Sequence, residues 1–329
     1  MFIIKYLCIF IGFALAAPNG IAQTALTGSG QTYPNKPVRM ILPFPPGGPT
    51  DLVGRLLAQK LSEQMGQPVP TDNRPGASGN IGLEAAAKSP ADGYTIVLSS
   101  PVISLSPHLY TRLNYDPYKD LAPISLVGAV LNVLIVHPSV PAKNLKELIA
   151  IARANPGKLN YGSGGIGTTT HLAPELLKSL EKLNIVHVPY KGSGLALIGM
   201  VSGQVDLLIM AAPSALGQIK GGRVRALAVL AEKRLSYLPE VPTTSEQGLK
   251  NAEVLVWYGM LAPTGTPAAL ITRLNSEIIK AVNAPDTKAR FESAGVEPMT
   301  STPEQLGQFI KSEAARFGKV IKEAGIRGE

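Results

Sequence analysis

A glycine-rich segment at residues 160–171 carries the residue types that can hold an anion. It follows residues 158–161, which are expected to end a strand, and precedes a predicted helix at 172–180 that Pro174 would start. Backbone N–H groups at a helix start lack partners within the helix, and with the helix dipole they attract negative charge. Glycines let the backbone approach a ligand closely. The candidate donors are Ser163, Gly164, Thr168, Thr169 and Thr170, of which Thr169 or Thr170 would cap the helix.

Residues 162–167 also fit the dinucleotide-binding pattern G-x-G-x-x-G. That pattern works with an acidic residue about 20 positions later, which holds a ribose hydroxyl. The corresponding region, residues 186–191, contains no aspartate or glutamate. We therefore expect no nicotinamide or flavin cofactor. A glycine turn without a ligand is the remaining alternative, and it is disfavoured because similar turns recur along the chain.

One such turn, at residues 43–51, connects a predicted strand at 38–42 to a helix with apolar positions from Leu52 onward. Phe44, Gly47, Gly48 and Pro49 lie within it. Thr50 is the expected helix cap, and Asp51 suits the first helical turn, where a carboxylate interacts favourably with the dipole.

A second turn, at residues 73–80, lies between a short predicted strand at 68–71 and a helix at 81–88. Ser78 or Asn80 can cap this helix. Ser100 follows a buried-looking strand at 94–99, and Ser193 follows a strand at 185–188. In open α/β sheets the carboxyl ends of strands are where ligands bind, so Ser100 is a candidate ligand contact.

Two long apolar stretches, residues 126–136 and 254–261, divide the chain. The first contains one strongly polar residue, Asn132. Both are expected to cross between two domains, each a mostly parallel sheet flanked by helices. The expected domains are residues 26–128 together with 255–329, and residues 129–254. A cleft between them, lined by glycine turns from both, is a natural ligand site.

The composition suits a globular α/β protein that binds a small anion. The chain has 329 residues, of which 45% are hydrophobic and 16% charged, and its net charge of +8 comes from scattered lysines and arginines. Aromatic residues make up 5% of the chain, which offers no evident stacking surface for bases, so no nucleic-acid partner is expected. A diffuse positive field suits small anionic ligands.

Residues 1–25 are expected to be a secretory signal peptide that is removed. Lys5 precedes an apolar run at residues 6–17, followed by small residues that suit cleavage. The run is short for a bilayer span, and an uncleaved anchor is the alternative. Cys8, the one cysteine, lies inside it, which excludes disulfide, thiol and cysteine–metal chemistry in the mature chain. We expect a secreted monomer without a cofactor or metal.

The residues favour binding over catalysis. The histidines His108, His137, His171 and His187 lack metal-ligand spacing, and neither a G-x-S-x-G elbow nor a P-loop occurs. His171 could contact ligand, but local hydrogen bonding is favoured, and Asp51 is favoured as a helix-start carboxylate. One alternative is a secreted α/β enzyme acting on a carboxylate with either residue as base. Another is a receptor that reports the same ligand for signalling. Abundant neutral donors instead favour reversible capture of a carboxylate.

Six blocks in one order resemble the Bug family, periplasmic solute-binding receptors of tripartite tricarboxylate transporters that are similar to TctC. The resemblance extends from about residue 33 to the end of the chain. The blocks are Pro43-Phe44 with Gly47 to Asp51, Asp72 to Gly82, Asp92 to Thr95, Leu159 to Ser163 with His171 to Ala173, His187 to Gly194, and Trp257 to Gly259 with Ala262 to Pro267.

This resemblance implies a two-domain, type II-like Venus-flytrap fold. First-domain loops would pinch a ligand carboxylate, partly through ordered water, and the second domain would close over it. It implies no enzyme activity, and membrane permease subunits as partners. Residue by residue, it points to Phe44, Gly47, Gly48, Pro49, Thr50, Asp51, Ser78 and Asn80 in the first domain, and to Ser163, Thr168, Thr169 and Ser193 in the second.

Two positions depart from the family pattern. Met210 stands in the apparent place of a family acid, and Pro174 stands where glycine is usual. An acid at the first position could pair with the ammonium of an amino acid, whereas methionine offers a soft apolar surface. With Met210 facing the cleft, we expect amino acids to bind worse than deaminated or aromatic acids. The alternative is that Met210 belongs to the core.

Overall fold

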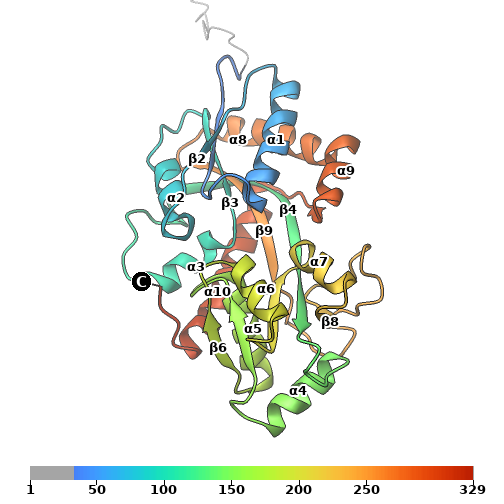
Figure 1. The fold of residues 1–329 in the computed structure, drawn as a ribbon. Coiled ribbons are helices and arrows are strands. Elements are labelled where there is room, and N and C mark those ends of the chain that lie inside the picture. Colours follow the sequence, from blue (N-terminus) through green and yellow to red (C-terminus); the bar gives the residue numbers. More distant parts are fainter. Residues whose placement is uncertain (1–32, 329) are drawn as a thin grey trace, which may run out of the picture. The chain divides into compact units, whose positions relative to one another are not determined.

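The computed structural model describes residues 33–328, in which strands from distant parts of the chain join into one curved array (Figure 1). The predicted signal peptide lies outside the described residues. The strands follow the order β2–β1–β3–β9–β4–β7–β5–β6, and β8 and β10 also pair with β4. β4 (Leu121–Val136) is therefore the central element, with partners on both sides of the array.

The first sheet contains the N-terminal strands, which pair in parallel as predicted. Its members are β1 (Arg39–Leu42), β2 (Thr71–Asn73), β3 (Thr95–Ser99), β9 (Leu255–Pro263), β10 (Val296–Pro298) and part of β4. β9, β4 and β10 run antiparallel to their neighbours, so the sheet is mixed. Its two faces are covered by α1 (Pro49–Met65), α8 (Ala268–Asn283) and α9 (Pro285–Ser293), and by α2 (Asn80–Ala87), α3 (Val102–Leu109) and α10 (Pro303–Glu323).

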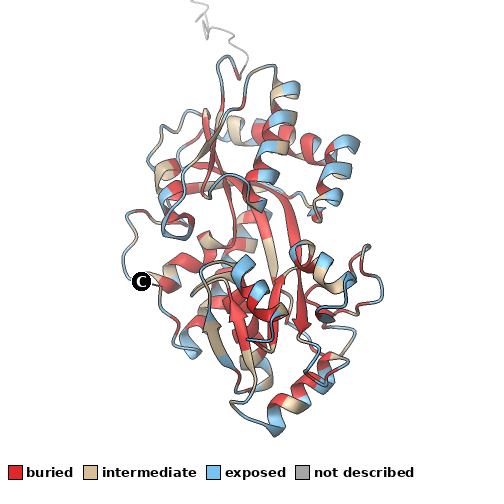
Figure 2. Cartoon of the chain, viewed as in Figure 1, coloured by how far each residue is buried: buried red, intermediate tan, exposed pale blue. Residues whose placement is uncertain are grey.

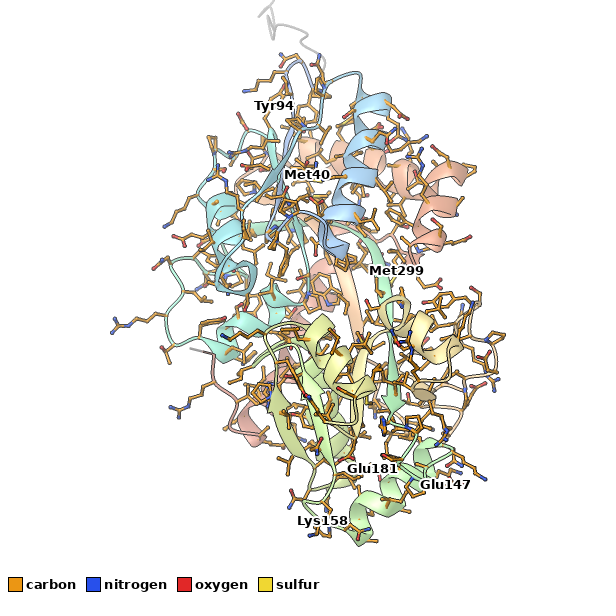
Figure 3. The ribbon with its side chains drawn as sticks, in the orientation of Figure 1. Met40, Tyr94, Glu147, Lys158, Glu181 and Met299 are labelled. Carbon is orange, nitrogen blue, oxygen red and sulfur yellow. The ribbon has the colours of Figure 1, made fainter. Side chains whose placement is uncertain are left out.

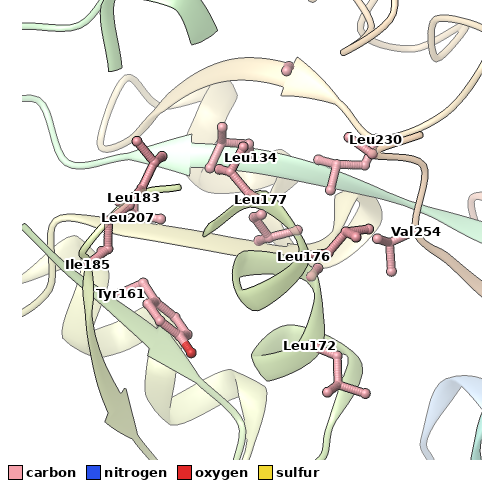
Figure 4. Packing of buried hydrophobic residues seen from close by; sticks show 14 of the residues in the cluster. Leu134, Tyr161, Leu172, Leu176, Leu177, Leu183, Ile185, Leu207, Leu230 and Val254 are labelled. Carbon is pink, nitrogen blue, oxygen red and sulfur yellow. The ribbon is translucent and has the colours of Figure 1, made fainter. Parts of the chain in front are cut away.

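In the second sheet, the glycine-rich segment includes one of the inner strands and continues beyond its carboxyl end. It consists of β5 (Asn160–Ser163), β6 (Val186–Pro189), β7 (Leu207–Ala211), β8 (Arg225–Val229) and the remainder of β4. Helices α4 (Leu145–Ala154) and α5 (Thr169–Glu181) pack on one face, and α6 (Ser193–Val201) and α7 (Ala212–Lys220) on the other. Figure 4 shows Leu177 of α5 close to Leu134 of the sheet and Leu176 close to Val254, and all four belong to one core cluster. This packing fixes the start of α5, where the predicted anion site lies.

β4 carries the chain from the first sheet to the second. Its residues as far as Leu131 pair with β9, with Leu131 opposite Leu255. From Asn132 onward it pairs with β7, and Asn132 lies opposite Ala211. Every residue from Ile124 to Val136 is buried, which explains the long apolar run, and β4 is coloured as buried along most of its length in Figure 2.

The C-terminal helix α10 is a further connection that sequence reasoning missed. Its first half places Leu306 and Ile310 in a core cluster of the first sheet. Its second half places Phe317 and Val320 among the core residues of the second sheet. A 21-residue helix is about 30 Å long, which is enough to reach both cores. Its apolar periodicity was evident in the sequence, but the identity of the surfaces it covers was not.

Two helix starts differ from prediction because glycine occupies the capping position. α1 begins at Pro49 after Gly48, so Thr50 lies inside the helix. α2 begins at Asn80 after Gly79, and Ser78 lies in a preceding 3₁₀ turn with a φ of 55°. Glycine reaches the backbone angles of such turns easily and therefore competes with side-chain caps.

The start of α5 also corrects the sequence reading. Thr168 is the residue before the helix, so neither Thr169 nor Thr170 is the cap. Pro174 lies inside α5, five residues beyond its start, and does not define where the helix begins. Because proline has no N–H, the helix loses one internal hydrogen bond at this position. The helix is retained because its residues from Thr170 to Leu177 are buried.

Candidate functional site

Most of the predicted donors gather around one cavity of about 430 Å³, here called the central cavity. Loops of the first sheet contribute Phe44, Pro49, Thr50, Ser78, Ser100 and Pro101. The glycine-rich segment and the start of α6 contribute Gly167, Thr168, Thr169, Thr170 and Ser193. The strands and α7 contribute Asn132, Met210, Ala211, Ser214, Val256 and Tyr258. The cavity is therefore formed by both sheets, as predicted for a ligand cleft.

The central cavity is lined by neutral groups. None of its lining residues in the described chain carries a charged side chain. Glu147 and Lys158, for example, lie at the periphery of the molecule in Figure 3 and are exposed. A second cavity of about 380 Å³, beside the start of α10, contains none of the predicted site residues. Hydroxyl groups and apolar surface thus dominate the chemistry of the central cavity.

The structure divides the predicted site residues into two sets. Phe44, Pro49, Thr50, Ser78, Ser100, Thr168, Thr169, Ser193 and Met210 line the central cavity. Gly47, Gly48, Asp51, Asn80, Ser163 and Gly164 do not line it. The second set has specific partners within the protein, and these show how the loops around the cavity are held.

Asp51 organises the first loop. Its carboxylate accepts hydrogen bonds from the Gly47 N–H (3.0 Å), Arg55 Nε (2.9 Å) and Asn73 Nδ2 (2.9 Å). The hydrogen bond from Arg55, followed by those from Gly47 and Asn73, lowers the Asp51 pKa to about 2. A carboxylate with this pKa is a poor general base near neutral pH. Asp51 therefore fixes the loop around Gly47, which brings Phe44, Pro49 and Thr50 to the cavity.

Asn80 has a similar supporting position. Its Nδ2 donates to the Ala77 carbonyl (2.8 Å), and its Oδ1 accepts from the Tyr115 hydroxyl (2.8 Å). Asn80 is buried, and both ends of its amide are therefore satisfied within the protein. These bonds hold the turn that places Ser78 at the cavity.

The glycine-rich segment satisfies several of its own backbone donors. The Gly164 N–H donates to Thr170 Oγ1 (2.7 Å), and the Gly167 N–H donates to His171 Nδ1 (3.0 Å). The Gly165 N–H donates to Ser163 Oγ (3.2 Å). These three N–H groups therefore point to partners within the turn. The threonines of the segment, and not these N–H groups, line the cavity.

Three stacked rings lie beneath this turn. The His171 and His187 rings are 4.0 Å apart between centroids, and those of His187 and Tyr161 are 4.8 Å apart. Burial, with a smaller contribution from His187, lowers the His171 pKa to about 4, and burial also lowers the His187 pKa. Both rings are therefore neutral near pH 7. Glu175 accepts from Tyr161 and pairs with Lys178 (2.6 Å), which completes a polar network below the site.

Gly164 is required by close packing. A Cβ atom there would lie 2.7 Å from Ser193 Oγ and 2.8 Å from the Ser193 backbone nitrogen. The absence of a side chain therefore lets the turn meet the start of α6. This contact brings Ser193 beside the threonines of the segment.

One wall of the cavity was missed by the sequence reasoning. Helix α3 contributes Val102, Leu105, Ser106 and Leu109, and Tyr110 follows it. The helical residues are spaced i, i+3, i+4 and i+7, which places them on one helical face. That periodicity could have identified the helix, but Pro107 within it weakened the pattern.

Two buried polar atoms at the cavity have no hydrogen-bond partner in the described chain. They are Ser106 Oγ and Asn132 Oδ1, from residues that are 0% and 1% exposed. Native proteins satisfy most buried polar groups, so each such atom calls for an explanation. Asn132 had a sequence signal as the polar interruption of an apolar stretch, whereas Ser106 had none.

Neither a metal centre nor a membrane span is found in residues 33–328. No three histidine, cysteine, aspartate or glutamate side chains of this range come together as a metal ion would require. None of its helices is long and apolar enough to cross a bilayer.

Comparison with known proteins identifies a protein family and solved structures of similar fold. Residues 53–326 match the family model described as tripartite tricarboxylate transporter family receptor, TctC. The chain is 39% identical to Protein BugT of Bordetella pertussis over 308 residues, covering 93% of this chain and 94% of that protein.

Solved structures with sequence similarity share the fold. The structure titled R. palustris Rpa4515 with adipate has a TM-score of 0.77 and 37% identity, covering 90% of this chain and 99% of that one. The periplasmic binding protein BugD has a TM-score of 0.74 and 35% identity, covering 90% and 100%. MatC from Rhodopseudomonas palustris with bound malate has a TM-score of 0.71 and 29% identity, covering 88% and 100%. The expected two-domain flytrap fold is confirmed.

Proposed function

The chain belongs to the tripartite tricarboxylate transporter receptor family, and from this premise we propose that it captures a small organic carboxylate in the central cavity for uptake. Receptors of this family are periplasmic solute-binding proteins rather than enzymes. Similar structures hold adipate and malate, which are both small carboxylates. Release to membrane permease subunits of a tripartite transporter is part of the proposal.

The observation that carries this proposal is the character of the cavity wall. It combines hydroxyl groups from both sheets with apolar surface and has no charged residue in the described chain. Neutral donors can hold a carboxylate without first desolvating a counter-charge. Ser100, Thr50 and Ser78 come from the first sheet, and Thr169 and Ser193 come from the second, whereas the Thr168 hydroxyl donates to the Gly165 carbonyl (2.7 Å). A carboxylate held between these sets would bridge the two sheets.

We also propose that the domains divide where the chain passes between the sheets. Residues 26–128 with 255–329 would form one domain, and residues 129–254 the other. The change of partner at Asn132 of β4 supports a boundary close to residue 129. Helix α10 contacts the cores of both sheets, so a movement of one sheet relative to the other would change the packing of α10.

A thermal-shift screen tests the function. Mono-, di- and tricarboxylates, aromatic acids and amino acids are tested against the mature protein. A ligand present at 100 times its Kd stabilises a protein by about 2.7 kcal/mol, which gives a clear shift in Tm. Recovery of the ligand unchanged after incubation separates binding from turnover. If no acid in the screen raised the Tm, the carboxylate proposal would be rejected.

Two serine variants locate the site. Ser100→Ala removes a hydroxyl from the cavity wall, whereas Ser312→Ala removes an exposed hydroxyl of α10 that bonds the Phe309 carbonyl. A hydrogen bond to a charged group contributes about 1.5–3 kcal/mol, so Ser100→Ala should weaken binding by roughly ten-fold or more. Ser312→Ala should bind as the natural protein does. Equal affinities in all three proteins would place the carboxylate elsewhere.

A further inference from the structure

Asn132 lies where the two sheets join. It is the first residue of β4 that pairs with β7, immediately after the last pair with β9. Its backbone carbonyl accepts from the Leu230 N–H (2.9 Å), which ties it to the segment after β8. The residue is 1% exposed and lines the central cavity. A side chain so placed has a fixed backbone and little freedom to move.

The orientation of the Asn132 amide follows from its partner. Nδ2 donates to the Val254 carbonyl (2.8 Å), just before β9 begins. A flipped amide would place Oδ1 against that carbonyl oxygen, and two acceptors would repel each other. Oδ1 is therefore the atom of the amide left without a partner, and it can only accept a hydrogen bond.

Asn132 Oδ1 has no donor in the described chain. Its neighbours along the strand, Leu131 and Val133, are apolar and buried. A buried acceptor without a donor costs free energy, and the cost is recovered when a ligand supplies one. Of the two unpartnered polar atoms at the cavity, Ser106 Oγ can donate or accept a hydrogen bond, whereas Asn132 Oδ1 requires a donor.

We propose that Asn132 selects carboxylates that also carry a neutral hydrogen-bond donor, either a hydroxyl or an amide N–H. This inference rests on the proposed function and narrows its ligand class. An ionised carboxylate has only acceptor oxygens, so it cannot satisfy Asn132 Oδ1 itself, and a second group of the ligand must do so. The cavity wall offers no carboxylate to a charged ammonium, so the donor is a neutral one. Hydroxy acids and the monoamides of dicarboxylic acids form this class.

The test compares ligands that differ by one donor. Isothermal titration calorimetry measures Kd for three pairs: succinate and malate, hexanoate and 6-hydroxyhexanoate, and the monomethyl ester and the monoamide of adipate. The natural protein should bind the donor-bearing member about ten-fold more tightly in at least one pair, because its partner leaves Oδ1 unsatisfied. In Asn132→Leu, which has similar size and no acceptor, the ratio for that pair should fall to about one.

Gln64→Leu is the matched control. Gln64 also has a buried side-chain oxygen without a partner, but it lies near the end of α1 and does not line the central cavity. The ratio of the two Kd values within each ligand pair should be the same for Gln64→Leu as for the natural protein. Using a ratio of two affinities within each variant removes any general loss of binding. If Asn132→Leu does not fold, Asn132→Ala, which also removes the acceptor, is measured in its place.

The outcomes separate this inference from the proposed function. Equal affinities within all three pairs in the natural protein would overturn the role of Asn132 and leave carboxylate binding intact. A ratio that survives in Asn132→Leu would also overturn it, because the donor would then be recognised elsewhere. Failure of every acid to bind the natural protein would remove the proposed function itself.

Discussion

Ser163 Oγ lies 2.6 Å from Nε2 of His187 on the neighbouring strand β6. Ser163 is fully buried, and its hydroxyl also accepts from the Gly165 N–H. A serine in a glycine turn can contact a ligand, but this one joins the turn to the stacked rings beneath it. Ser163 therefore supports the turn beside the central cavity and does not line the cavity.

The first prediction concerns Ser163→Ala. The substitution removes the partner of a half-buried histidine, so it should lower the free energy of unfolding of the empty protein by about 1–3 kcal/mol. Carboxylate affinity should change less than in Ser100→Ala. Urea unfolding and calorimetric titration measure the two effects. A large loss of affinity with unchanged stability would show that Ser163 contacts the ligand directly.

The second prediction uses two glycines. Gly164→Ala should destabilise the protein by about 1–3 kcal/mol, because its Cβ would press on the Ser193 backbone. Gly217→Ala, inside α7 with no atom within 4 Å of the added Cβ, should stabilise it by about 0.5–1 kcal/mol. Thermal unfolding of both variants checks the opposite signs. A neutral Gly164→Ala would mean that α6 and the turn can separate freely.

The third prediction is a pH dependence from His171. Its folded pKa of about 4 lies below its ordinary value of 6.5, so between these values the unfolded state binds more protons. The stability that neutral His171 contributes is complete above about pH 6.5 and is lost as the pH falls toward 4. The loss should reach up to about 3 kcal/mol over this window. Urea unfolding from pH 7.5 to 4.5 measures it, above the range in which Asp51 titrates.

His171→Gln is the variant that isolates this effect. Its amide oxygen can still accept from the Gly167 N–H but does not titrate. The variant should therefore show a flatter pH profile than the natural protein. His137→Gln, which removes a histidine outside the ring stack, is the matched control. Parallel curves for the natural protein and His171→Gln would assign the pH dependence to other groups.

The fourth prediction concerns amino acids. Met210 lines the cavity and is 2% exposed, and the described cavity wall has no carboxylate. A buried ammonium without a partner pays a desolvation cost of several kcal/mol. Succinate should therefore bind more tightly than aspartate, and phenylpropionate more tightly than phenylalanine, by at least about ten-fold. Competition titrations decide this, and tighter binding of either amino acid would contradict it.

The fifth prediction is closure on binding. The cavity is formed by both sheets, and a ligand that contacts both stabilises the arrangement in which they are closer. Small-angle scattering should show a smaller radius of gyration with a saturating carboxylate than without it. A ligand that stabilises the protein in the thermal-shift screen is used for the measurement. Identical scattering profiles would indicate a rigid cavity.

The sequence by itself determined the class of fold and the general chemistry of the site. Strands followed by glycine turns and helices recur because glycine permits the backbone angles of those turns, and the apolar periodicity of each helix marks its packed face. The first long apolar stretch marked β4, the strand that passes from one sheet to the other, and Asn132 was already conspicuous there. These features are local, so they can be recognised without knowing what lies next to them.

The tertiary structure decided which polar residues face the ligand site. Ser163 and Gly164 look like ligand donors in sequence. In the structure Ser163 Oγ is bonded to His187, and Ser193 packs against Gly164, and both partners are distant in the chain. The wall supplied by α3 and the open acceptor of Asn132 likewise depend on strand register and on the carbonyl of Val254, 122 residues away. A hydrogen-bonding group acts on a ligand only when the protein leaves it free, and that depends on all of its neighbours in space.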